Sequence, residues 1–150
     1  MTEFVKPELL SHIPGHIRDS LGQLVERVLE FKPVIGNIKV DVRKIVLFGS
    51  LANGNWKSES SDIDVAIVMA NSYPFYYEHI DAGKITPLQI NLMSYSVHGV
   101  KDHELRKRIK IAVCTESDLD GILAKIDDGR GILSEAIKKG IPLYDKQSVI

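Results

Sequence analysis

The spacing of apolar residues along the chain predicts a helix followed by two short strands. Between residues 17 and 29 an apolar side chain recurs every three or four positions, which predicts a helix over about 15–31. Residues 44–48 are short and nearly all apolar, which is typical of a central strand covered on both faces. Residues 62–69 alternate acidic with aliphatic side chains and then become wholly apolar. They predict a second strand that begins in an acidic segment.

The remaining pattern predicts one more strand and three more helices. Residues 87–93 alternate in character and predict a third strand, whereas residues 71–84 follow neither period and are expected to form a loop or a short irregular helix. Helical patterns occupy about 100–113, 117–127 and 131–139, and Gly140 is well suited to end the last of them. No repeat or linker interrupts the chain, so we expect one domain over residues 1–150. Its expected class is α/β (α+β), with a short mixed sheet and helices packed chiefly on one face.

Composition narrows the class of protein. A chain of 150 residues that is 44% hydrophobic and 26% charged can bury its own core. Its net charge of -1 argues against an extensive nucleic-acid surface. The absence of a long apolar run argues against a membrane span, and the lone Cys114 favours a reducing, cytoplasmic location.

One segment departs from this neutral balance. Residues 101–110 contain five basic and two acidic side chains. They could attract an acceptor phosphate or nucleic acid, or they could form the solvated face of a helix.

The candidate chemistry lies between the first two predicted strands. Gly49 and Ser50 follow a buried strand and are expected to open a helix, where free backbone N–H groups favour an anion and glycine allows a phosphate to approach. Asp62 and Asp64 are two apart on a strand, so their carboxylates share one face. Mg²⁺ binds one or two carboxylates together with substrate phosphates. Either pattern alone also occurs in ordinary turns, but their combination predicts a phosphate and metal site in a polar cleft at the strand ends.

These two patterns together resemble a known signature. Residues 49–54 (Gly-Ser-Leu-Ala-Asn-Gly) followed by 61–65 (Ser-Asp-Ile-Asp-Val) resemble the motif of the DNA polymerase β-like nucleotidyltransferase superfamily, and above all its minimal members. The resemblance implies that Gly49 and Ser50 contact a nucleoside triphosphate and that Asp62 and Asp64 hold Mg²⁺. It also implies transfer of a nucleoside monophosphate to an acceptor hydroxyl, with release of pyrophosphate.

The chain departs from that signature in three places. Leu51 and Asn53 replace arginines that often occupy the motif, and the loop before Asp62 is one residue longer than the commonest spacing. The family also takes a third, acceptor-activating carboxylate from a neighbouring strand, and the residue that we align with it is Asn91. An amide can coordinate through its oxygen, but it brings no negative charge and cannot accept a proton.

Two functions follow from this departure. The first is Mg²⁺-dependent nucleotidyl transfer in which Asp62, Asp64 and Asn91 are the catalytic residues, with activity impaired by the amide. The alternative is a degenerate nucleotide-binding or antitoxin-like regulatory module that acts with a protein partner. Glu78 and Asp81 are other carboxylates that could fill the third position. A second protein or a homodimer could complete the cleft of so small a domain.

Overall fold

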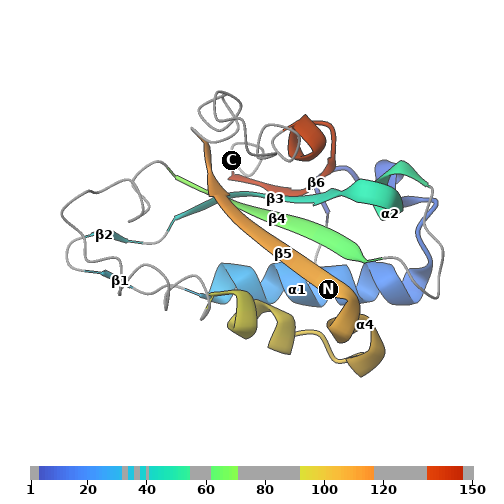
Figure 1. The fold of residues 1–150 in the computed structure, drawn as a ribbon, viewed down its shortest axis with the longest axis horizontal. Coiled ribbons are helices and arrows are strands. Elements are labelled where there is room, and N and C mark those ends of the chain that lie inside the picture. The colour runs from blue at the N-terminus through green and yellow to red at the C-terminus, as the bar shows by residue number, and fades with distance from the viewer. Residues whose placement is uncertain are drawn as a thin grey trace.

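The core of the protein is a mixed four-stranded sheet with the order β5-β4-β3-β6 (Figure 1). Strand β5 pairs with β4 in parallel, and the other two pairs are antiparallel. The computed structural model describes residues 4–31, 34–35, 38–39, 41–54, 62–70, 92–116 and 135–146. The strands of this sheet are β3 (Val42–Phe48), β4 (Ile63–Met69), β5 (Ile109–Thr115) and β6 (Ile141–Asp145). A separate two-stranded antiparallel sheet consists of β1 (Val34–Ile35) and β2 (Ile38–Lys39).

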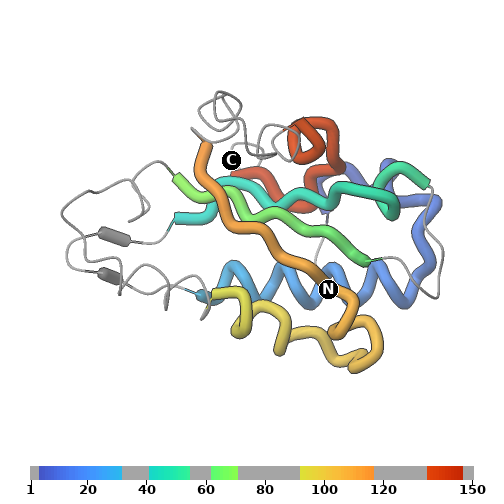
Figure 2. Tube along the Cα trace, in the orientation of Figure 1, coloured from blue at the N-terminus to red at the C-terminus, as the bar shows by residue number. Residues whose placement is uncertain are grey.

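The helices gather mainly on one side of the sheet. The 3₁₀-helix η1 (Pro7–Leu10) precedes the long helix α1 (Gly15–Glu30), and the segment 92–98 is also helical. Figure 2 shows this segment beside α1. The guanidinium carbon of Arg27 in α1 lies 3.7 Å from the ring centroid of Tyr95 in this segment. Two short helices, α2 (Gly49–Asn53) and α4 (His103–Arg108), lie next to strand ends. Within the described segments, no helix is long and apolar enough to cross a membrane.

Alternate residues of the central strands face two cores of different size. Leu47, Val65 and Ile67 belong to the larger core, which includes the buried face of α1. Ala66 and Val68 belong to a smaller cluster on the opposite face, together with Ile137 of the helical turn at 135–138. The predicted class, a mixed sheet with helices chiefly on one face, is confirmed.

The structure confirms the elements with the clearest periodicity and corrects two others. Helix α1 and strands β3 and β4 match the predictions. The helix predicted over about 100–113 is wrong in its second half, because α4 ends at Arg108 and β5 begins at Ile109. This run of β-branched residues pairs with buried β4 along its whole length, and that pairing outweighs a weak helical pattern.

The third predicted strand is also wrong where the structure describes it. Leu92 and Met93 begin the helix at 92–98, whereas residues 87–91 lie outside the described segments, as do 71–84 and 117–127. The last predicted helix is helical at 135–138 and ends before Gly140, and its residues 131–134 are not described. Strand β6, which follows, was not predicted.

Gly140 packs too closely against β3 to accept a side chain. A Cβ at this position would lie 2.5 Å from the Leu47 carbonyl oxygen, a backbone atom that cannot rotate away. We therefore expect Gly140→Ala to lower the free energy of unfolding by about 1–3 kcal/mol. Urea unfolding measures this, and Gly15→Ala is the control, because its Cβ would meet only the Arg18 guanidinium at 3.7 Å. Equal stability of the two variants would contradict the expected clash.

Candidate functional site

The pairing of β3 with β4 brings the two sequence motifs together. Phe48, the last residue of β3, lies opposite Asp64 in the antiparallel register. Gly49 follows at once and opens α2, so the glycine and the carboxylate are neighbours. A Cβ on Gly49 would lie 2.5 Å from Oδ2 of Asp64. The cleft predicted at the ends of these two strands therefore has its proposed phosphate-binding and metal-binding residues in direct proximity.

Two features favour glycine at position 49, namely its backbone conformation and the closeness of Asp64. Its φ of +78° lies in the left-handed region that side chains disfavour. Gly54, which ends α2 with a φ of +80°, has the same backbone requirement. A Cβ on Gly54 would meet no atom within 4 Å, so only Gly49 combines a left-handed conformation with close contact to Asp64.

The two carboxylates of the site repel each other. Asp62 is exposed and Asp64 is half-buried. Burial, followed by the charge of Asp62, raises the pKa of Asp64 above its ordinary value. A divalent cation between such carboxylates would relieve both effects. The pair of carboxylates therefore fits Mg²⁺, which binds one or two carboxylates together with substrate phosphates.

A positive charge lies on the other side of Asp64. In the parallel register of β4 and β5, Asp64 pairs with Lys110, so both side chains project from the same face of the sheet. Lys110 is exposed, and its charge lowers the pKa of Asp64, against the two larger effects. Lys110 was part of the basic segment interpreted as helical. The alternating β-branched residues around it were the signal that would have assigned it to a strand.

A second residue that the sequence did not indicate is His12. Its Nε2 donates a hydrogen bond to the carbonyl oxygen of Leu51 at 2.9 Å, because a carbonyl can only accept. This bond joins the segment before α1 to α2, the helix that begins with Gly49. Nothing in the local pattern distinguishes His12 from an ordinary surface histidine.

The structure brings together four of the predicted site residues, and the fifth lies outside the described residues. Gly49 and Ser50 open α2 beside the start of β4, where Asp62 and Asp64 lie. Asn91 lies outside the described residues. Among the described strands, β4 is paired with β3 on one edge and with β5 (Ile109–Thr115) on the other. In the parts of the chain that are placed, no cluster of three or more His, Cys, Asp or Glu side chains could hold a metal.

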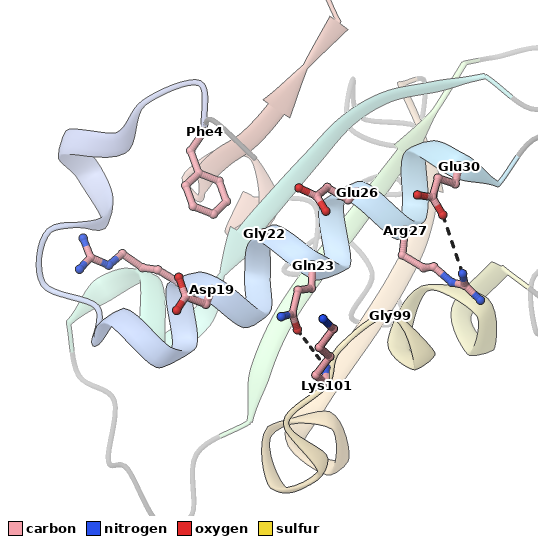
Figure 3. A pocket seen from close by; sticks show the side chains of 10 residues that line it. Phe4, Asp19, Gly22, Gln23, Glu26, Arg27, Glu30, Gly99 and Lys101 are labelled. Carbon is pink, nitrogen blue, oxygen red and sulfur yellow. Dashed lines mark hydrogen bonds and ion pairs between the residues drawn. The ribbon is translucent and has the colours of Figure 1, made fainter. Parts of the chain in front are cut away.

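A separate groove of about 590 Å³ runs along the outer side of α1 (Figure 3). Its lining alternates in charge, with Asp19, Glu26 and Glu30 near Arg27 and Lys101. Some of these charged side chains already interact with one another, such as Arg27 and Glu30, whose charged groups are 3.8 Å apart. None of the motif residues lines this groove.

Comparison with known proteins supports the classification that the fold and the paired motifs suggest. The nucleotidyltransferase domain family model matches residues 22–126, and the chain belongs to this family. The structure is similar to that of a "putative nucleotidyltransferase" from Sulfolobus solfataricus, with a TM-score of 0.50 and 16% sequence identity. That match covers 91% of this chain and 89% of the other and shows a common fold. Among curated proteins, none matches this chain.

Proposed function

We propose that this domain transfers a nucleoside monophosphate from a nucleoside triphosphate to an acceptor hydroxyl and requires Mg²⁺ to do so. The observation that carries the proposal is the juxtaposition of Gly49 with Asp64 in a chain that belongs to the nucleotidyltransferase domain family. The first is suited to a phosphate and the second to a cation, and phosphoryl transfer needs both within one site.

Each residue of the site has a distinct role in this proposal. Gly49 and Ser50 bind the triphosphate through the backbone N–H groups at the start of α2 and through the Ser50 hydroxyl. Asp62 and Asp64 would hold Mg²⁺, which when bound neutralises phosphate charge. Asp64 is half-buried and Asp62 is exposed, so a cation held by both would lie where a triphosphate can reach it from solvent.

The proposed reaction forms one bond and breaks one bond. The acceptor oxygen attacks the α-phosphorus, the bond between the α-phosphorus and the bridging oxygen breaks, and pyrophosphate leaves. The sequence resemblance assigned Asn91 to the acceptor side, but the strand that pairs with β4 in the structure is β5, which presents Lys110 beside Asp64. Because neither the amide of Asn91 nor the ammonium group of Lys110 can accept the hydroxyl proton, we propose that this proton passes to solvent and that transfer is slow.

The proposal also includes the cellular location of the protein and its partners. The lone Cys114 favours a cytoplasmic location. The domain is small, and a second protein or a second copy of the chain would complete the acceptor side of the cleft.

A second candidate function is nucleotide binding without efficient transfer, as in a regulatory or antitoxin-like module. The observation that favours it is the charge next to Asp64. The neighbouring strand presents Lys110 at this level instead of an acidic residue. The two functions share the nucleotide site and differ only in turnover.

Calorimetric titration with ATP, GTP, CTP and UTP tests the shared step. We expect at least one of them to bind in the presence of Mg²⁺ and to bind far more weakly with EDTA, because the two carboxylates repel the triphosphate when no cation is bound. At 100 times the dissociation constant, binding should stabilise the fold by about 2.7 kcal/mol. No binding by any of the four would contradict both functions. Where a triphosphate does bind, an assay for released pyrophosphate and for labelled acceptor distinguishes nucleotidyl transfer from binding without transfer.

A further inference from the structure

The side of Asp64 that faces away from Gly49 carries the cationic side chain of Lys110. Strand β4 lies between β3 and β5, and Asp64 pairs with Phe48 on one edge and with Lys110 on the other. Across this end of the sheet the order is therefore the glycine that opens α2, the carboxylate, and then the lysine. All three belong to the face opposite α1, since Phe48 packs in the smaller cluster on that face.

This order gives the two sides of the carboxylate pair different electrostatic character. On the α2 side, Gly49 has no side chain and no charge, and its backbone packs close to Oδ2 of Asp64. On the β5 side, a cation would meet the ammonium group of Lys110. Like charges on the same face of the sheet repel each other, and the repulsion is stronger where a partner such as Asp64 is half-buried. The carboxylates of Asp62 and Asp64 together carry two negative charges, which one divalent cation balances.

The helix before β5 is also rich in basic residues, of which Lys107 is paired with Glu104 at 3.8 Å and Arg106 donates to the Val100 carbonyl oxygen. Helix α4 leads directly into β5, and its last turn contains Arg106, Lys107 and Arg108. The acidic residue of that segment nearest the helix start, Asp102, is used as the helix cap and accepts hydrogen bonds from the backbone N–H groups of Glu104 and Leu105. In the described part of the chain, no third metal-ligating side chain joins Asp62 and Asp64.

We propose that Lys110 limits this site to one divalent cation and supplies the second positive charge through its own ammonium group. The inference rests on the proposed function, because it concerns the same nucleotide site. Lys110 is then a residue that determines metal stoichiometry. In sites with two metal ions, the second ion compensates charge on the attacking oxygen. Here an ammonium group that cannot leave with the product would provide that charge.

Counting bound Mn²⁺ by electron paramagnetic resonance tests this proposal without measuring activity. The protein is titrated with Mn²⁺ in the presence of a non-hydrolysable analogue of the triphosphate that binds best. We expect one Mn²⁺ per chain for the parent and two for Lys110→Glu, because the new carboxylate and Asp64 together form a second metal-binding site. Lys110→Gln should still bind one ion, about threefold more tightly than the parent, because only the repulsion is removed. Lys110 is exposed, so these variants are expected to fold, and thermal unfolding checks this.

The matched control is Lys101→Glu. It makes the same change in net charge at an exposed residue on the α1 groove, away from the motif residues. We expect it to bind one Mn²⁺ with parental affinity. Two ions in the parent, one ion in Lys110→Glu, or two ions in Lys101→Glu would each overturn the proposal. If the analogue and Mn²⁺ do not bind to any variant, the proposed nucleotide site is itself wrong, and this inference fails with it.

Discussion

Asp64→Asn is expected to abolish Mg²⁺-dependent nucleotide binding and to leave the fold intact or slightly more stable. The substitution keeps the shape of the side chain and removes one of the two charges that would hold the cation. It also relieves the repulsion between Asp62 and Asp64 in the metal-free protein. Calorimetric titration with Mg²⁺ and the best triphosphate measures the loss of binding.

The stability of this variant should depend on pH in a defined direction. Because the pKa of Asp64 is raised above 3.8 in the folded protein, chiefly by burial and then by Asp62, the folded state holds its proton more tightly than the unfolded state. This contribution favours folding at low pH and is lost as the pH rises through the raised pKa. The metal-free parent should therefore lose stability over that range, and Asp64→Asn should lose less. At pH 7 the metal-free Asp64→Asn variant should therefore be slightly more stable than the parent, and the gain is small because the carboxylate is partly exposed and solvent screens it.

The control for this prediction is Asp19→Asn, which removes one exposed carboxylate from α1. It should retain full nucleotide affinity. If Asp64→Asn unfolds in the cold or keeps the affinity of the parent in Mg²⁺, the assigned metal role is wrong.

Gly49→Ala is expected to weaken nucleotide binding by at least about tenfold and to destabilise the fold by about 1–2 kcal/mol. The stability loss arises because an alanine at a φ of +78° adopts a left-handed conformation. The binding loss arises because the new Cβ would approach Oδ2 of Asp64 to 2.5 Å and displace the carboxylate. A displacement of this kind at a reacting site has a large effect on binding and catalysis.

Gly54→Ala separates these two causes. Its φ of +80° imposes the same backbone strain, but its Cβ would meet no atom within 4 Å. Both variants should lose similar stability in urea unfolding, whereas only Gly49→Ala should lose nucleotide affinity. Equal loss of affinity in the two variants would show that the strain of α2, and not the contact with Asp64, controls binding.

The sequence by itself determined the elements and motif whose signals are local. The three- and four-residue spacing from Ile17 onward determines α1, because one helix face must be apolar to pack on the sheet. The apolar run ending at Phe48 and the alternation after Asp62 determine β3 and β4, because strands buried on both faces need continuous apolar side chains. The Gly-Ser and Asp-x-Asp pairs were visible in the sequence, and their resemblance to a known signature indicated the family.

Only the tertiary structure decided which strand lies beside Asp64. Residues 109–115 carry both a weak helical period and a β-branched run, and the pairing of β5 with buried β4 selects the strand. That choice places Lys110 opposite Asp64, the carboxylate proposed to bind the metal. The close contact of Gly49 with Asp64 likewise depends on the register between β3 and β4. Pairing and register are properties of backbone hydrogen bonds between distant segments, so spacing along one segment cannot reveal them.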